Sequence, residues 1–560
     1  MRIITILFAL VALPVVAASP EAVQGKNGMV TSRSALASEV GVGILKSGGN
    51  AIDAAVATGF ALAVTYPSAG NIGGGGFAVI RLENGEVLIL DHRETAPGSA
   101  SRDMYLDADG DVIRGLSTRT HKASGVPGTV DGLLLLLQHH GTKSRKEVMA
   151  PAILLAKDGF PLTRNLAAQF ARVLQAMAPY PASKAKFSKN GTPYAAGDVW
   201  KQPDLAATLE EISKKGRDGF YKGRVAKLIV AEMQRGNGDI SLADLADYRS
   251  VWREPIKGTY RGYDIWGMSP PSSGGVLIVQ MLNMLEPYDV KALGWGSAQL
   301  IHLMVEAQRR AYADRAEHLG DSDFYNVPVA TLTSKAYARK RFGDFDPDRA
   351  SDSEAIGAGS WPEESAETTH FSVMDGKGNV VALTTTLNSG YGSKIVAAGS
   401  GILLNNEMND FSIKKNVPNQ FGLIGRVANA IEPGKRMLSS MSPTIVTKDG
   451  VPFLVTGSPG GSTIITTALQ VIVNVIDHEM TLEDAVSLPR FHHQWKPDSI
   501  SYGKHGISPD SLKILQQMGH RNLRAARWGR GFGDANSILY RDGVIYGMKD
   551  PRNEGAAIGY

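Results

Sequence analysis

The 560-residue chain contains no cysteine. This absence excludes disulfide bonds, cysteine nucleophiles and metal sites built on thiolates. The chain must therefore depend on its buried core for stability. With 43% hydrophobic and 20% charged residues, it has ordinary globular composition and enough length for a large core.

Long apolar runs are also scarce. The only one lies at the N-terminus, where MRIITILFALVALPVVAAS joins one arginine to an apolar stretch and a small-residue site near Ala17 and Ala18. This pattern predicts a secretory signal peptide over residues 1–18, although an uncleaved anchor fits it too. The stretch is short for a membrane span. We therefore expect a soluble mature protein, periplasmic or secreted, with no membrane association.

A strong charge of either sign is missing. The 59 Lys and Arg residues against 55 Asp and Glu leave a net charge of +4, and no basic stripe stands out. A nucleic-acid partner is therefore not expected. The glycine run Gly73–Gly76 lacks the Gly-Lys-Ser/Thr ending of a phosphate-binding loop, which argues against a nucleotide cofactor.

What the chain does contain is a hairpin led by threonine. The run TTHFSVMDGKGNVVALTTTLN begins at Thr368 and predicts two strands joined by a glycine-rich turn centred on Lys377. Antiparallel pairing about that turn puts Thr368 opposite Thr386, with β-carbons roughly 4.5–5.5 Å apart. A threonine hydroxyl needs an adjacent base to act as a nucleophile, and its own α-amine serves when the chain is cut before it. The alternative is that Thr368 and Thr386 are ordinary strand-forming residues in an edge hairpin.

The segment before Thr368 has the composition that a cleavable junction needs. Residues 351–367, SDSEAIGAGSWPEESAE, are rich in Ser, Gly and Ala and carry five acidic residues and no basic one. A solvated tail of this kind can separate from a strand without disturbing a core. We therefore predict cleavage between Glu367 and Thr368, while a plain surface loop fits the composition equally.

A second predicted hairpin, PTIVTKDGVPFLVTG (443–457), turns at an Asp-Gly pair and would bring Ser439 opposite Gly460. Its two prolines can introduce a bulge and shift that register by one residue. Ser462 would cap the apolar helix that follows, with the first helical N–H groups and those of Gly460 and Gly461 directed to one place. Such donors can form an oxyanion hole. A Pro-Gly turn that merely leads into a helix is the alternative.

A third predicted hairpin, GGFAVIRLENGEVLILDHR (75–93), turns at Asn84-Gly85 and would put Arg93 opposite Gly76. Glycine leaves room for a guanidinium group. We therefore expect Arg93 in an open, glycine-lined recess that suits bidentate recognition of a carboxylate.

Seven segments, in this order along the chain, resemble the γ-glutamyltransferase (γ-glutamyl transpeptidase) family of N-terminal-nucleophile hydrolases. They are GNAIDAAVATGFALAVTYPSAGNIGGGGF (49–77), DHRETAP (91–97), TTHFSVMDGKGN (368–379), SGILLNNEMNDF (400–411), MLSSMSPTIV (437–446), TGSPGGS (456–462) and PRFHHQW (489–495). The resemblance implies an α+β, four-layer αββα sandwich formed by both products of self-cleavage. It also implies a large subunit (19–367) and a small catalytic subunit (368–560) in one interleaved heterodimer, with no cofactor.

The resemblance also implies roles for individual residues. Thr368 would be the nucleophile, supported by Thr386, and Gly460 and Gly461 would supply the oxyanion donors. The substrate's α-carboxylate would be held by Arg93, Ser439 and Ser440. Its α-ammonium would be held by Asn388, Glu407 and Asp410. A lid would span residues 414–426, with Phe421 where other members have tyrosine.

Two adjacent histidines, His492 and His493, look like metal ligands in isolation, but no matching carboxylates stand near them, so we interpret them as structural. We predict an exported γ-glutamyl hydrolase/transferase that acts on glutathione and similar γ-glutamyl amides, with water, an amino acid or a peptide as acceptor. A γ-glutamyl-Thr368 ester would be the intermediate. The alternatives are a glutaryl or cephalosporin-type acylase of the same fold and a non-catalytic solute-binding protein.

Overall fold

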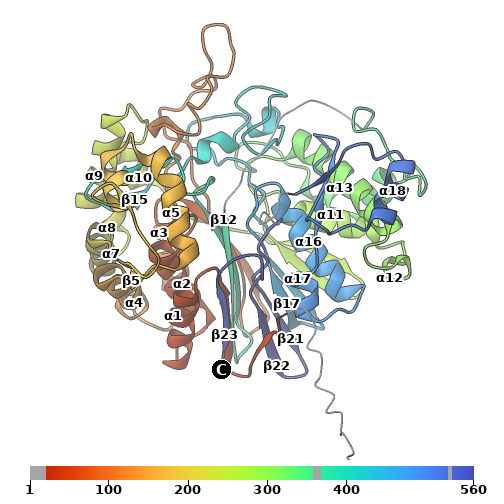
Figure 1. Ribbon diagram of the computed structural model, residues 1–560, viewed down its shortest axis with the longest axis horizontal. Coiled ribbons are helices and arrows are strands. Elements are labelled where there is room, and N and C mark those ends of the chain that lie inside the picture. The colour runs from red at the N-terminus through yellow and green to blue at the C-terminus, as the bar shows by residue number, and fades with distance from the viewer. Residues whose placement is uncertain (1–19, 357–367, 527–531) are drawn as a thin grey trace, which may run out of the picture.

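Two antiparallel β-sheets pack face to face in the middle of the molecule, and helices cover the outer face of each (Figure 1). The computed structural model describes residues 20–356, 368–526 and 532–560. The four layers confirm the predicted αββα sandwich. Each sheet contains strands from both sides of the predicted cleavage point, so neither half can form the fold alone.

Each of the two sheets has seven strands. The first has the order β23 (Ala556–Gly559), β2 (Gly28–Ser32), β12 (Thr368–Asp375), β13 (Val380–Thr386), β3 (Gly75–Arg81), β4 (Val87–His92), β9 (Val251–Arg253). The second has the order β1 (Val23–Gly25), β22 (Val544–Met548), β21 (Ser537–Arg541), β17 (Val451–Thr456), β16 (Thr444–Lys448), β11 (Tyr263–Gly267), β10 (Ile256–Tyr260). Short ladders join β5 (Phe160–Pro161) to β8 (Val199–Trp200), β6 (Ser188–Lys189) to β7 (Thr192–Pro193), β14 (Val396–Ala397) to β15 (Ile402–Leu403), and β18 (Phe491–His492), β19 (Ile500–Tyr502) and β20 (Leu523–Ala525) to one another.

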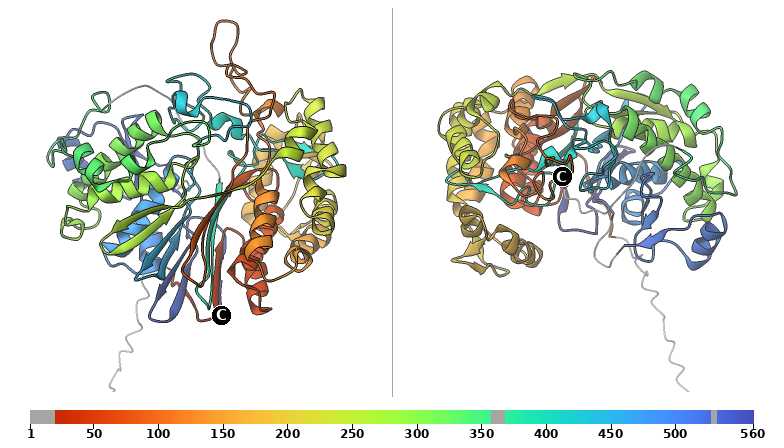
Figure 2. Two further views of the ribbon diagram at one scale, coloured as in Figure 1. Left: turned by 180° about the vertical axis from the view of Figure 1, so that it is seen from behind. Right: turned by 90° about the horizontal axis from the view of Figure 1, so that it is seen from above.

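The helices form two groups, one on each sheet (Figure 2). On and beyond the first sheet lie α1 (Ala35–Lys46), α2 (Ala51–Thr65), α3 (Thr129–His140), α4 (Arg145–Asp158), α5 (Arg164–Met177), α6 (Pro181–Lys186), α7 (Pro203–Lys215), α8 (Asp218–Tyr221), α9 (Gly223–Arg235) and α10 (Leu242–Asp247). On the second lie α11 (Gly274–Leu285), α12 (Val290–Leu293), α13 (Ala298–His318), α14 (Val329–Leu332), α15 (Lys335–Arg341), α16 (Thr463–Ile476), α17 (Leu482–Ser487) and α18 (Pro509–Gln517). Short 3₁₀ helices are η1 (His121–Ala123), η2 (Glu407–Asp410) and η3 (Val427–Asn429). Among the described helices, none combines the length and apolarity needed to cross a bilayer.

Helix α2 is buried along its whole length because small side chains let it lie close to the first sheet. Its first turn is closed by a capping box, in which Asn50 accepts from the backbone of Asp53 and the Asp53 carboxylate accepts from the backbone of Asn50. The N–H of Ala51 donates to the carboxylate of Asp375 at 3.0 Å. This bond ties the helix to the end of β12.

The two sheets meet across a layer of apolar side chains. Residues of this layer that are at most 1% exposed include Phe77, Val79, Ile89, Val380, Ile445, Val455 and Ile538. Burying one such aliphatic or aromatic side chain contributes roughly 1.5–3 kcal/mol. The alternation of side chains along a strand then decides which residues face this layer and which face the helices.

Strand β12 lies in the centre of the first sheet, between β2 and β13. The register predicted from its turn is confirmed, because Thr368 pairs with Thr386 and the ladder continues to Met374 opposite Val380. The alternative of an edge hairpin is wrong, since both strands have neighbours on their outer sides. On one side of β12 the pairing with β13 reaches Thr368, and on the other side the pairing with β2 begins at Ser372.

The register predicted for the β3–β4 hairpin is wrong by one residue. Gly76 pairs with His92 instead of Arg93. The loop has three residues, 83–85, because the N–H of Leu82 bonds the carbonyl of Glu86 and Gly85 adopts a φ of +92°. Arg93 therefore follows the end of β4 and turns away from the sheet.

The β16–β17 hairpin contains the bulge that its prolines allowed. Thr447 pairs with Pro452 as predicted, but beyond the bulge Val446 pairs with Leu454. The ladder ends at Thr444 and Thr456, so the predicted pairing of Ser439 with Gly460 is wrong. Ser439 forms an isolated bridge with Ser272 instead. The predicted signal peptide (1–18) and the residue Glu367 lie outside the described residues.

Gly74 provides a test of how tightly the chain packs at the end of β13. A β-carbon on Gly74 would lie 2.0 Å from the carbonyl oxygen of Thr386. We expect Gly74→Ala to lower the free energy of unfolding by about 1–3 kcal/mol, the usual cost of overpacking. Gly43→Ala is the matched control, because nothing lies within 4 Å of that β-carbon in α1 and alanine favours a helix by roughly 0.5–1 kcal/mol. Equal denaturation midpoints for the two variants would contradict the close contact.

Candidate active site

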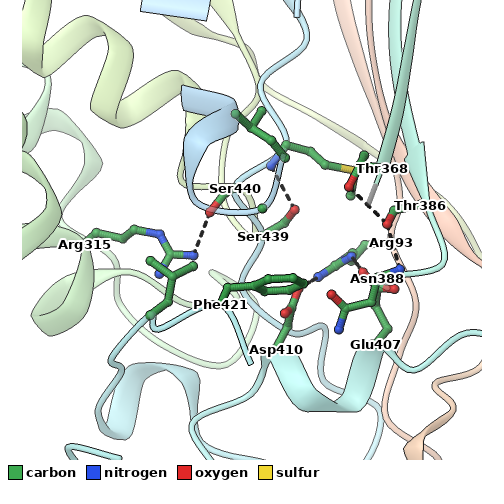
Figure 3. Close-up of a pocket in the computed structure, with 14 residues that line it drawn as sticks. Arg93, Arg315, Thr368, Thr386, Asn388, Glu407, Asp410, Phe421, Ser439 and Ser440 are labelled. Carbon is green, nitrogen blue, oxygen red and sulfur yellow. Dashed lines mark hydrogen bonds and ion pairs between the residues drawn. The ribbon is translucent and has the colours of Figure 1, made fainter. Parts of the chain in front are cut away.

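The predicted site residues gather around one pocket of about 310 Å³ (Figure 3). Those that line it are Arg93, Thr368, Thr386, Asn388, Glu407, Asp410, Phe421, Ser439, Ser440 and Gly461. They come from segments that are far apart in sequence, on both sides of the predicted cleavage point. Arg315, Leu423, Met441 and Ile464 also line the pocket and were not predicted.

The hydroxyl groups of Thr368 and Thr386 lie 3.4 Å apart at one side of the pocket. The backbone N–H of Asn388 donates to the Thr386 hydroxyl oxygen at 2.7 Å. This bond forms because Asn388 has a φ of +74°, which turns the chain back at the end of β13. With its oxygen already accepting, the Thr386 hydroxyl can donate its proton to Thr368. The geometry suits a threonine whose hydroxyl is oriented for attack.

Arg93 is fully buried and is enclosed by carboxylates, so the expected open recess is wrong. Its Nη1 contacts Glu407, its Nη2 donates to Asp410 at 2.7 Å, and its Nε donates to the carbonyl of Met437 at 3.2 Å. Arg93 follows the end of β4, and η2, which is far away in sequence, brings both acidic residues to it. Glu94, which sequence reasoning did not single out, lies 3.5 Å from the same guanidinium.

Glu94, Glu407 and Asp410 form an acidic cluster around Arg93, and their carboxyl groups are hard to ionise together. Burial raises the pKa of Glu407 well above its usual value and also raises that of Asp410, although Arg93 acts against both shifts. Burial also raises the pKa of Glu94 to about 7. Burial lowers the pKa of Arg93, but the attraction of Glu407, Glu94 and Asp410 outweighs it and leaves the pKa raised. The cluster as a whole therefore favours a cationic ligand group beside it.

Two serine hydroxyls at the other side of the pocket accept hydrogen bonds from the protein. Ser439 Oγ accepts from the backbone N–H of Met441 at 3.1 Å, and Ser440 Oγ accepts from Arg315 Nη2 at 3.2 Å. Neither hydroxyl donates to another described group within hydrogen-bond distance. Both protons are therefore available to a ligand acceptor in the pocket.

The Gly460–Gly461 corner lies at the start of α16, and Gly461 lines the pocket. Both have positive φ, +134° and +54°, which favours glycine here. Ser462 occupies the N-cap position of α16 as expected, but its side chain makes no capping hydrogen bond to the helix. Instead, the Thr463 hydroxyl donates to the carbonyl of Gly460 at 2.8 Å.

The predicted lid, residues 414–426, contributes Phe421 and Leu423 to the lining of the pocket, and Phe421 is 4% exposed. Phe421 brings no hydroxyl to the ligand, but its neighbours fasten the segment by hydrogen bonds. Ser389 donates to Gln420 at 2.8 Å, and Asn419 donates to Asp410 at 3.3 Å. The segment therefore contacts the acidic cluster through Asn419, which the sequence pattern did not indicate.

His492 and His493 are both buried, and both make hydrogen bonds. His492 bonds Thr466 and Gln494, and His493 bonds Asp498. A separate group, His302, Glu306 and His520, has ligand atoms within 4.8 Å of one another. There Glu306 is ion-paired with Arg309 and Arg310, whose positive charges would oppose a metal ion.

Comparisons with a family model and with curated proteins indicate one family. The family described as Gamma-glutamyltranspeptidase matches residues 37–560. The chain is 51% identical over 535 residues to a glutathione hydrolase proenzyme of Escherichia coli (strain K12), covering 95% of this chain and 91% of that protein. It is 47% identical over 562 residues to a glutathione hydrolase proenzyme of Pseudomonas sp. (strain A14), covering 97% and 96%.

A solved structure shares the whole fold. The cephalosporin acylase from Bacillus halodurans superposes with a TM-score of 0.84 at 26% identity, covering 99% of both chains. The family model matches nearly the whole sequence, and two glutathione hydrolase proenzymes are about half identical to it. Together these matches identify the family. The chain belongs to the γ-glutamyltranspeptidase family.

Proposed function

We propose that the protein is an exported γ-glutamyl hydrolase/transferase that cleaves glutathione and other γ-glutamyl amides. In this proposal the precursor loses residues 1–18 and cuts itself between Glu367 and Thr368. The products are a large subunit (19–367) and a small subunit (368–560) that stay together. The single observation that carries the proposal is the pair of threonine hydroxyls, 3.4 Å apart, at the edge of a pocket that holds groups of both charges.

The reaction would proceed in two acyl transfers. The Thr368 hydroxyl attacks the γ-carbonyl carbon, its proton passes to the Thr368 α-amine, and N–H groups of Gly460 and Gly461 stabilise the oxyanion. The amine returns the proton to the leaving nitrogen as the amide bond breaks, which leaves a γ-glutamyl-Thr368 ester. Water or the amine of an amino acid or peptide then attacks the ester and frees the hydroxyl. These steps need no cofactor.

Recognition of the γ-glutamyl group would use the two ends of the pocket. Asn388, Glu407 and Asp410 would bind the α-ammonium, because the acidic cluster favours a cation. Arg93, Ser439 and Ser440 would bind the α-carboxylate, since both serine protons are available to an acceptor. Phe421 would cover the bound group and exclude water.

Two other functions stay open to test. The similarity to a cephalosporin acylase suggests an enzyme for glutaryl amides, which carry the carboxylate but lack the ammonium. The cluster of Glu407, Asp410 and Glu94 favours the γ-glutamyl group, since a glutaryl chain has no ammonium group for these carboxylates to bind. A non-catalytic solute-binding protein would not need a cleaved chain.

The first prediction concerns processing. The purified protein should give two fragments on a denaturing gel, and the N-terminal sequence of the smaller one should begin at Thr368. Thr368→Ala should leave one inactive chain, because the attacking hydroxyl is gone. Thr369→Val is the matched control, since the buried Thr369 hydroxyl has no hydrogen-bond partner among the described residues and valine keeps its shape. Two fragments from Thr368→Ala would place the nucleophile elsewhere.

The second prediction concerns Thr386. Thr386→Val removes the hydroxyl that orients Thr368, so we expect kcat per processed molecule to fall by about ten-fold to a hundred-fold with little change in KM. Thr386→Ser restores the hydroxyl and should recover most of the turnover. Unchanged turnover in the valine variant would show that Thr386 only fills the sheet.

The third prediction separates the γ-glutamyl enzyme from an acylase. A γ-glutamyl anilide should be cleaved at least about ten-fold more efficiently than the matching glutaryl anilide, since one charge-assisted hydrogen bond is worth roughly 1.5–3 kcal/mol. Asp410→Asn should reduce this preference by lowering kcat/KM for the γ-glutamyl donor alone. Equal efficiency toward both anilides in the unaltered protein would favour the acylase.

A further inference from the structure

The predicted lid, residues 414–426, is contacted by a side chain that does not itself line the pocket. Gln494 is 6% exposed, and its amide nitrogen Nε2 donates to the backbone carbonyl of Phe421 at 3.3 Å. The same nitrogen donates to the carbonyl of Lys496 at 3.2 Å. Both amide protons of Gln494 are therefore used, and one of them is used on a lid residue that lines the pocket.

The Gln494 side chain is itself oriented by His492. Its Oε1 can only accept, so the bond of 2.9 Å to His492 Nε2 requires a proton on that ring nitrogen. Burial lowers the pKa of His492 to about 4, so the ring is neutral near pH 7 and its Nδ1 carries no proton. Nδ1 then accepts from the Thr466 hydroxyl at 2.9 Å. Hydrogen bonds in one direction therefore lead from Thr466 through His492 and Gln494 to the lid.

The start of this chain of bonds is held by the second helix layer. Thr466 lies on α16, in which the residues from Thr463 to Val475 are all buried. The ring of Tyr312, from α13, packs edge-on against His492 with centroids 5.7 Å apart. These neighbours restrict the imidazole, and the imidazole in turn fixes the direction of the Gln494 amide. A donor with a fixed direction loses little conformational entropy when it binds the lid.

Two other hydrogen bonds of the lid run to segments around the pocket. Ser389 donates to Gln420, and Asn419 donates to Asp410. The ammonium of a bound donor at Asp410 would compete with Asn419 for the same carboxylate. The bond from Gln494 involves no residue that is proposed to bind the ammonium or the carboxylate, so donor binding leaves it intact.

We propose that Gln494, oriented by His492, is a positioning residue that holds the lid against the pocket through the carbonyl of Phe421. This inference rests on the proposed γ-glutamyl function, and it gives the segment PRFHHQW (489–495) a task in that function. The Phe421 side chain has no hydroxyl with which to fasten the lid, so its backbone carbonyl provides the attachment. Loss of the bond shifts the lid toward an open form in which Phe421 no longer covers the donor.

The first measurement is cleavage of the lid by trypsin, which needs no enzymatic activity of the protein. The peptide bond after Lys415 lies in the lid, and its cleavage under native conditions follows the population of the open form. Gln494→Met keeps the length of the side chain without the amide protons. We expect this variant to be cut about three-fold to ten-fold faster, as for loss of one neutral hydrogen bond. Mass spectrometry of the new N-terminus at Asn416 gives the rate.

Gln470→Met is the matched control. Gln470 is 5% exposed, lies on α16 and donates to the carbonyls of Thr466 and Phe491 at 2.7 and 2.8 Å, neither of which belongs to the lid. This control should be cut after Lys415 at the rate of the unaltered protein, even where its melting temperature falls. An unchanged rate in Gln494→Met, or equal acceleration in both variants, would overturn the proposal.

A second variant decides the matter if Gln494→Met does not fold. Thr466→Val keeps the shape of its side chain and removes the hydroxyl that donates to His492. We expect it to be cut after Lys415 about two-fold to five-fold faster, since the imidazole loses one of the bonds that fix its orientation. A Thr466→Val protein that is cut at the unaltered rate would then refute the proposal.

Donor kinetics separate failure of this proposal from failure of the proposed function. Gln494→Met should raise the KM of a γ-glutamyl anilide by up to about ten-fold and change kcat per processed molecule by less than about two-fold, because its bond acts on the lid and not on the threonines. If no anilide is turned over but the difference in trypsin cleavage holds, the enzymatic proposal fails and the role of Gln494 stands. Unchanged cleavage and unchanged KM would refute that role even when the enzyme is active.

Discussion

The antiparallel ladder between β12 and β13 is the constraint on which the pocket depends. It begins at Thr368, on a strand in the middle of a sheet, and sets Thr368 directly beside Thr386. A central strand cannot shift without losing hydrogen bonds on both sides, so the two hydroxyls keep their distance. The turn after β13 then brings the N–H of Asn388 back to Thr386.

Buried charge shapes the remainder of the pocket. Arg93 is surrounded by three acidic side chains, and Arg315 makes its hydrogen bonds to the hydroxyl groups of Ser273 and Ser440. Burying so many charged groups together is costly, and under the proposed function the ammonium of a γ-glutamyl group would be attracted by the acidic side chains.

Hairpin registers were predictable only where the loop length was evident from sequence. The β12–β13 turn is short and glycine-bounded, so the pairing of Thr368 with Thr386 followed correctly. The β3–β4 loop has one residue more than expected, which moved Arg93 off the sheet. The β16–β17 pairing contains a bulge and stops before Ser439. Sequence patterns locate turns well, but a single inserted residue depends on the twist and packing of the neighbouring strands.

The sequence by itself determined the threonine hairpin, because one short turn sets its register, and through the resemblance of seven segments to a known family it also predicted the αββα class and most residues that line the pocket. Only the tertiary structure decided that Arg93 is enclosed by Glu407 and Asp410, that Glu94 stands beside it, and that Arg315 reaches the pocket from α13. The contacts of Arg93 with Glu407 and Asp410 join residues more than 300 positions apart. Burial and ion pairing are properties of the packed chain, so no local pattern contains them.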